Sequence, residues 1–462
     1  MKLAYSSHRR NGRVTERERA SVLVIVLLIA FGLISIALCF ANSMSLELRA
    51  SDNRASGLAS DQIIEGAARY VSSVLVSYAT NGAVPDIIQY QAEAVPLGKA
   101  NVLEENGRFW LIGRDPAGSP SSEPYFSLID EASKLDLNAP WLTSGIISSN
   151  LPRMTFELAD AMIDWRDTNG TGGSLNYAQL GYLPKHAPFE TVGELRLVDG
   201  ATRDILVGED INQNGVLDAN ENRNGLTDPG LFDHFTVYSR QPNTHSDGTA
   251  LTNVNEQAGL RTLLEERLGA SRAQTVIQSL FGGGGGPGGG PPVTPAFGSL
   301  LRFYLTASRT AGMTADEFAQ IYNDITVTNA SFTIGRVNIN TAPAAVLACL
   351  PGMDLNSAQQ LVNHRLSNPV GLTSIAWIVD ALGSSHPALQ TLAQGDYITT
   401  RSYQFTADIA AVGPFGRGYR RVRFVFDISE GTPKVIYRQD LSRLGWALGR
   451  QTRDTWIAKN IR

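Results

Sequence analysis

The chain has 462 residues, enough for two or three packed units, and a formal net charge of −5. Charged residues make up only 18% of it, without a polybasic character, so the composition does not favour nucleic acid as a partner. Cys39 lies in an apolar run and Cys349 in a predicted soluble helix, which excludes a disulfide framework.

The first predicted element is an uncharged apolar run from Ser21 to Phe40. At about 1.5 Å per residue, a helix of this length spans roughly 30 Å, the hydrocarbon core of a bilayer. The leader, residues 1–20, is rich in lysine and arginine, which predicts a cytoplasmic N-terminus and transfer of the rest across the membrane. The alternative is a cleaved secretory signal, whose apolar core would usually span only about 7 to 15 residues. We therefore predict a retained transmembrane helix at residues 21–41.

The helical pattern continues past the apolar run, through residues 42–80. This stretch has no proline, and its apolar residues recur at helical spacing between Ile64 and Tyr78. We therefore predict a single helix whose second half lays an apolar stripe on a soluble domain. Two helices separated by a break between residues 51 and 60 are the alternative.

Short segments with strand character come next, and more of them lie near the C-terminus. They are residues 109–112, 125–129, 134–137, 403–412, 419–427 and 435–439. A long helix followed by hairpins is typical of an α+β fold in which one helix packs across an antiparallel sheet. We expect residues 81–137 and 399–449 to form this sheet domain, with residues 138–398 inserted as a mostly helical domain.

A basic leader, an apolar helix, a helical extension and then strands resemble a type IV pilin or a type II secretion pseudopilin. In that family a prepilin peptidase removes the leader, which implies cleavage between Ala20 and Ser21, although Ala20 replaces the usual glycine. Most members carry glutamate at the fifth mature position, where this chain has Ile25. K-type minor pseudopilins lack that glutamate. A subunit without it gives up a pairing contact within the membrane, which suits the end of a filament.

Three stretches in the middle of the chain also resemble K-type pseudopilins. They are FSLIDEASKLDLNAP at 126–140, FELADAMIDW at 156–165 and APFETVGEL at 187–195. At the end of the second stretch, Asp164, Asp167 and Asn169 offer oxygen atoms that could hold calcium. The alternative is a helix C-terminus capped by Asn169 and Gly170, with solvated aspartates.

The sharpest motif is DINQNGVLDANE at residues 210–221, which matches the calcium-loop pattern D-x-[DN]-x-[DN]-G-x5-E. Calcium takes oxygen ligands, here Asp210, Asn212, Asn214, the carbonyl of Val216, Asp218 and Glu221. No helices flank the loop as in an EF-hand, so we predict a calcium site at 208–228 that is fastened to other structure. The alternative is a string of turns. Residues 220–228 repeat the first part of the pattern without a terminal glutamate.

Residues 255–281 have helical spacing and lead into a glycine-rich tether at 281–292, which cannot pack a core. Beyond the tether, Leu300 to Leu305 and Ser331 to Ile334 are predicted to be extended.

Residues 337–366 predict two short helices around a Pro-Gly turn, similar to a helix-hairpin-helix unit and to a stretch of K-type pseudopilins. Asp354 stands where DNA-binding versions of this unit have glycine. Its carboxylate would repel phosphate, so no nucleic-acid partner is expected.

No histidine pair has metal-ligand spacing and no nucleophile motif is present, so the sequence gives no support for catalysis. The resemblance implies a non-enzymatic K-type minor pseudopilin at the tip of the type II pseudopilus, with I-type and J-type minor pseudopilins and the inner-membrane platform as partners. It also implies an inner-membrane anchor with the bulk of the chain in the periplasm. The loop motif adds calcium as the expected cofactor. A membrane-anchored calcium-binding adhesin or export factor unrelated to pili is the alternative.

Overall fold

The computed structural model describes most of the chain, in two units: residues 1–58 and 59–462. The described residues are 16–80, 82–85, 92–98, 106–115, 124–168, 177, 181–218, 221, 229–282 and 296–460. Asn169, most of the glycine-rich tether and most of residues 219–228 lie outside them.

The first element is a single helix, α1, Glu16–Val76, of 61 residues. Its helical assignment is unbroken between residues 51 and 60, so the alternative of two separate helices is wrong. The apolar side chains between Val22 and Phe40 are exposed. This helix is long and apolar enough to cross a membrane. The backbone of Ala20 and Ser21 lies within it, and their side chains lie outside the described residues.

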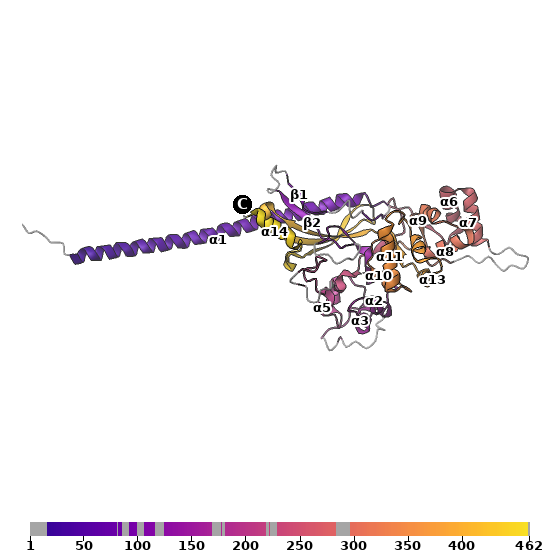
Figure 1. Cartoon of the computed structure of the whole chain (residues 1–462), viewed down its shortest axis with the longest axis horizontal. Coiled ribbons are helices and arrows are strands. Elements are labelled where there is room, and N and C mark those ends of the chain that lie inside the picture. The colour runs from indigo at the N-terminus through magenta and orange to yellow at the C-terminus, as the bar shows by residue number, and fades with distance from the viewer. Residues whose placement is uncertain are drawn as a thin grey trace, which may run out of the picture. The chain divides into compact units, whose positions relative to one another are not determined.

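The second unit contains an antiparallel sheet whose strands come from residues 95–130 and from residues 404–440 (Figure 1). Its strands are β1 Val95–Leu97, β2 Gly107–Leu111, β3 Ile129–Asp130, β12 Gln404–Val412, β13 Tyr419–Asp427 and β14 Lys434–Asp440. They run in the order β1-β2-β12-β13-β14, and β3 also pairs with β12. Every residue of the central strand β12 is buried.

Side-chain alternation along these strands builds a core on each face of the sheet. Phe109 and Leu111 of β2 pack in the core that contains Ile64 and Val71 of α1. Trp110 of β2 points to the opposite face and packs with Ile112, Ala447 and Leu448. A long helix on an antiparallel sheet, with further helices elsewhere in the unit, makes the fold α+β, as the sequence predicts.

A third and larger core lies between Leu135 and Ile398, and it is built mainly from helices. These are α2 Ser144–Asn150, α3 Phe156–Arg166, α5 Arg203–Val207, α6 Gln257–Leu268, α7 Ala270–Phe281, α8 Leu300–Ala311, α9 Ala315–Tyr322, α10 Ala344–Ala348, α11 Leu355–Ser367, α12 Trp377–Leu382 and α13 Pro387–Leu392. Short strand pairs connect them: β4 Leu135–Asp136 with β5 Phe235–Thr236, β6 Arg240–Pro242 with β9 Phe332–Ile334, β7 Thr252–Asn253 with β8 Ile325–Thr326, and β10 Val337–Asn338 with β11 Ile398–Thr399. The chain ends in α14, Gly449–Asn460.

Two sequence-based expectations about these elements are wrong, and a third is refined. Residues 300–305 are not extended but begin α8, because Ser299 caps the helix and the apolar spacing continues to Ala307. The helical character expected at 255–281 is confirmed, in two helices that meet at Gly269 with φ +86°. The strand expected at 134–137 pairs in parallel with β5 and does not join the main sheet.

A buried carboxylate, Asp130, joins the main sheet to the helical core. It accepts hydrogen bonds from Asn338 Nδ2 (3.1 Å), Thr341 Oγ1 (2.5 Å) and Ser402 Oγ (2.7 Å). Burial raises the pKa of Asp130 to about 6. Asp136, which accepts from the Asn138 backbone N–H at 2.8 Å, has its pKa raised by burial to about 7.

These two acids predict a loss of stability as pH rises from 4 to 7. In that range the unfolded chain releases their protons while the folded chain retains them, so each rise in pH favours unfolding. Replacing Asp136 with asparagine removes its share, worth up to about 4 kcal/mol. Denaturant unfolding of the full chain in detergent at pH 4.5 and pH 7.5 should show a smaller pH dependence for Asp136→Asn than for the natural chain. Equal pH dependence would contradict this.

Candidate metal centre

The predicted calcium loop follows α5 directly, and Gly208 ends that helix with φ +69°. Five of the six predicted ligand residues are buried: Asp210, Asn212, Asn214, Val216 and Glu221. The sixth, Asp218, is partly buried. The structure therefore places the acidic and amide side chains of the motif inside the protein, where charges need compensation.

The loop closes on its own side chains. The carboxylate of Asp210 accepts hydrogen bonds from the backbone N–H groups of Asn214 (2.9 Å) and Gly215 (2.7 Å). Gly215 has φ +83°, so the sharp turn that the motif predicts at this glycine is present. The carboxylate of Glu221 returns to the start of the loop and accepts from the Asn212 N–H at 3.0 Å.

The acids of the loop accept backbone hydrogen bonds, yet burial still raises the pKa of two of them. Burial raises the pKa of Asp210. The nearby charge of Arg114 opposes that rise, although its guanidinium hydrogen-bonds Asp233 and the Gln213 carbonyl rather than Asp210. Burial also raises the pKa of Glu221, and the charges of Asp210 and Asp218 add to the effect. The Glu221 carboxylate accepts hydrogen bonds from the backbone N–H groups of Asn212 and Asp218. A divalent cation among these oxygens would relieve the repulsion.

The side-chain amides of Asn212 and Asn214 lie beside the Asp218 carboxylate. Their Nδ2 atoms are 2.7 Å and 3.3 Å from Asp218 Oδ2. Within the described ranges, no three His, Cys, Asp or Glu side chains gather closely enough to form a metal site alone. A calcium ion in this loop would therefore need the amide and backbone oxygens of the motif as well as its carboxylates, and hard oxygen donors of this kind fit calcium.

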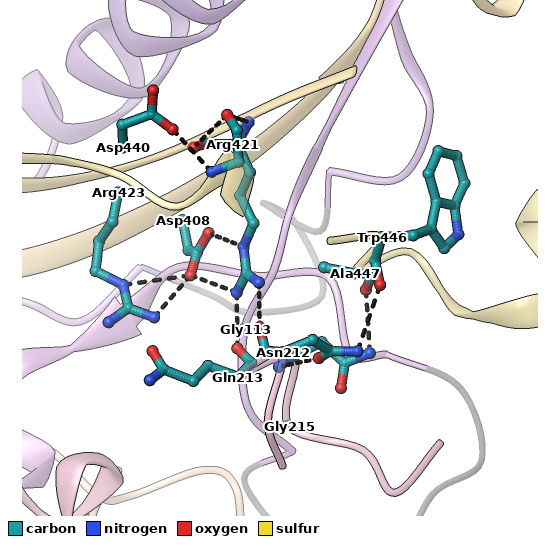
Figure 2. Close-up of polar contacts among 12 residues, drawn as sticks. Gly113, Asn212, Gln213, Gly215, Asp408, Arg421, Arg423, Asp440, Trp446 and Ala447 are labelled. Atoms are coloured by element: carbon teal, nitrogen blue, oxygen red, sulfur yellow. Dashed lines mark hydrogen bonds and ion pairs between the residues drawn. The ribbon is translucent and has the colours of Figure 1, made fainter. Parts of the chain in front are cut away.

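The loop is fastened to the sheet by a buried arginine of β13. Arg421 is fully buried, and its guanidinium donates to the backbone carbonyls of Asn212 and of Gln213 (2.7 Å for the latter) (Figure 2). The same guanidinium pairs with the buried Asp408 of β12 through contacts of 2.7 and 2.8 Å. Arg423 contacts Asp408 from the other side at 2.8 Å. Although burial opposes ionisation, the two guanidinium groups hold the pKa of Asp408 at about 2.

A second arginine reinforces this attachment. Arg114 follows β2, pairs with Asp233 through contacts of 2.6 and 2.8 Å and donates to the Gln213 carbonyl at 3.3 Å. The loop is thus attached to strand β13 and to the segment that follows β2 by charged donors that the motif did not indicate. Asp408 and Arg423 lie opposite each other in the register of β12 and β13, a pairing that only the structure reveals.

The second candidate metal site is less complete. Asp164 is buried in α3, and burial raises its pKa while His186 opposes the rise. Asp167 ends α3, and its backbone N–H donates to the carbonyls of Ile163 and Asp164. Asn169, the third predicted ligand, lies outside the described residues. The metal interpretation of these residues stays a prediction.

Two polar side chains of the helix-hairpin-helix-like segment, Asp354 and Arg365, bond to backbone groups of the protein. Asp354 caps α11, where its carboxylate accepts from the Ser357 N–H at 2.7 Å. The buried Arg365 donates to the carbonyls of Ile339 (3.0 Å) and Ala342 (2.7 Å). These residues therefore stabilise the helical core.

Residues 337–397 match the family model of type II secretion system (T2SS), protein K. This match confirms, over those residues, the resemblance to K-type pseudopilins. One solved structure that the chain resembles is the GspK-GspI-GspJ complex of the type 2 secretion system from enterotoxigenic Escherichia coli, at 10% sequence identity and a TM-score of 0.37. That alignment covers 85% of this chain and 99% of the other. No curated protein matches the chain.

Proposed function

We propose that this chain is a non-enzymatic K-type minor pseudopilin of a type II secretion system, which sits at the tip of the pseudopilus, helps initiate its assembly and supports protein export. The match of residues 337–397 to the family model of protein K carries the proposal. A long helix that is apolar enough to cross a membrane and continues onto an antiparallel sheet supports it. The apolar Ile25 at the fifth position of the mature helix, where most pseudopilins have glutamate, suits a terminal subunit.

The proposal includes a location and partners. The basic leader supports a cytoplasmic N-terminus, a single span of the inner membrane and a periplasmic remainder. The expected partners are the I-type and J-type minor pseudopilins, the inner-membrane platform and the prepilin peptidase. The bulky helical core between Leu135 and Ile398 would hinder another subunit from stacking above this one.

Purification of the full chain from detergent-solubilised membranes tests this assignment. We expect the I-type and J-type minor pseudopilins to co-purify, and N-terminal sequencing to begin at Ser21. A chain that keeps its leader and purifies without those subunits would contradict the proposal. It would favour a membrane-anchored calcium-binding protein unrelated to pili.

Calcium is the proposed cofactor, bound by Asp210, Asn212, Asn214, the Val216 carbonyl, Asp218 and Glu221. The match of the loop to the calcium motif and the burial of its acids, of which Glu221 is repelled by Asp210 and Asp218, support it. Three carboxylates and two neutral amides suggest modest affinity, which suits an extracytoplasmic site where calcium is plentiful.

Calcium at millimolar concentration should raise the melting temperature of the full chain in detergent by about 3–6 °C relative to chelator. Binding to the folded state alone stabilises that state, and Glu221→Gln should abolish the shift because it removes a carboxylate from the loop. Glu430→Gln, which alters an exposed acid that pairs with Lys434, is the matched control and should keep the shift. A melting temperature that is insensitive to calcium would overturn the calcium assignment.

A further inference from the structure

The amide side chains of the loop face two ways. The Oδ1 atoms of Asn212 and Asn214 point into the loop, where they accept from the backbone N–H groups of Asn214 (2.9 Å) and Val216 (3.0 Å). Their Nδ2 atoms reach outward to the carbonyls of Trp446 and Ala447, at 3.3 Å each (Figure 2). Each amide therefore has its oxygen on the predicted calcium side, while its nitrogen is shared between the Asp218 carboxylate of the loop and a distant part of the chain.

That distant part is the terminal segment, residues 446–448, which leads into α14. Ala447 and Leu448 are fully buried and complete the core on the outer face of the sheet, together with Trp110 and Ile112. The Trp446 ring packs against Tyr419 of β13, with ring centroids 5.2 Å apart. Docking of the terminal segment thus determines whether one face of the sheet is covered.

We propose that the loop is a calcium-dependent latch for the terminal segment. A cation held by the amide oxygens fixes the orientation of both amides, which keeps their nitrogens on the Trp446 and Ala447 carbonyls. Without the cation, the Asp218 carboxylate competes for both amide nitrogens, which it already contacts, and the two hydrogen bonds to the terminal segment are released. The proposal rests on calcium binding by the loop, as proposed above.

The backbone attachments of the loop restrict the effect of calcium to the two amide side chains. Arg421 and Arg114 hold the carbonyls of Asn212 and Gln213, so the base of the loop stays on the sheet whether or not the amides move. The freedom that a cation removes therefore lies in the side chains of Asn212 and Asn214. Two neutral hydrogen bonds contribute on the order of tenfold or more to the docking equilibrium.

Hydrogen–deuterium exchange of the full chain in detergent tests the latch, in parallel with calorimetric titration of calcium. We expect calcium, relative to chelator, to slow exchange of the backbone amides in residues 445–452 by about tenfold. The double variant Asn212→Asp with Asn214→Asp keeps oxygen ligands but loses both amide donors. Its calcium affinity should rise because the loop gains two carboxylates, whereas calcium should no longer protect residues 445–452.

Asn243→Asp is the matched control, because Asn243 is also buried and also donates to a backbone carbonyl, that of Ala330 at 2.9 Å. This variant should retain calcium-dependent protection of residues 445–452. If the natural chain binds calcium and exchange in residues 445–452 does not change, the latch is wrong and the calcium assignment stands. If the natural chain binds no calcium in the titration, both are wrong.

Discussion

Replacing Arg421 with glutamine is expected to lower the free energy of unfolding by about 3–5 kcal/mol. Arg421 is fully buried and serves three acceptors at once: the Asp408 carboxylate and the carbonyls of Asn212 and Gln213. Glutamine is shorter and uncharged, so it leaves Asp408 less compensated in the core and the two carbonyls without their donors. Urea unfolding of the full chain in detergent at pH 7 measures the loss.

Arg423→Gln is the control for this prediction. Arg423 pairs with the same carboxylate, but its side chain is 22% exposed, and its guanidinium hydrogen-bonds Asp408 rather than a loop carbonyl. Its replacement should cost about 1 kcal/mol, since water can solvate the exposed side of the pair. Equal losses for the two variants would show that Arg421 acts only as a counter-ion and does not hold the loop.

Gly230→Ala is expected to destabilise the protein by roughly 3–5 kcal/mol. Gly230 has φ +68°, and a Cβ atom there would lie 2.3 Å from the Val207 carbonyl carbon and 2.5 Å from the Gly208 nitrogen. Those backbone atoms end α5 just before the predicted calcium loop, so they cannot move aside without shifting the start of the loop. The melting temperature and the calcium affinity should both fall.

Gly248→Ala separates backbone strain from this steric contact. Gly248 also has a positive φ, +85°, but a Cβ atom there would meet nothing within 4 Å. Alanine should therefore cost only the strain of the left-handed conformation, about 1–2 kcal/mol, and leave calcium affinity unchanged. A Gly230 variant no less stable than the Gly248 variant would contradict the close packing at the base of the loop.

Periodic patterns made much of the fold predictable. The long helix and strands β12, β13 and β14 were expected near their observed positions, because apolar spacing over many residues separates helix from strand. The prediction of an extended segment at residues 300–305 was wrong because six residues are too few to show a helical period. The parallel pairing of β4 with β5 was not predictable, since a partner 100 residues away in the chain leaves no local signal.

The candidate site was predictable in part, for a related reason. Asp210 and Gly215 have the turn geometry that the motif implies, because a loop that bonds to itself is encoded locally. The attachment by Arg421 depends on the packing of a strand more than 200 residues downstream. A basic residue in a strand usually faces solvent, so the sequence pattern of β13 alone could not show that Arg421 is buried.

The pairing of β2 with β12 has a kinetic consequence. Leu111 lies opposite Ile409, so the strand that covers the apolar stripe of α1 is synthesised almost 300 residues after its neighbour. Until that strand emerges from the ribosome, Ile64, Val71 and Leu75 have only part of their partners. Because so long a stretch of chain must close, folding is slow and passes through an intermediate with exposed apolar surface. This topology therefore predicts dependence on chaperones during biogenesis.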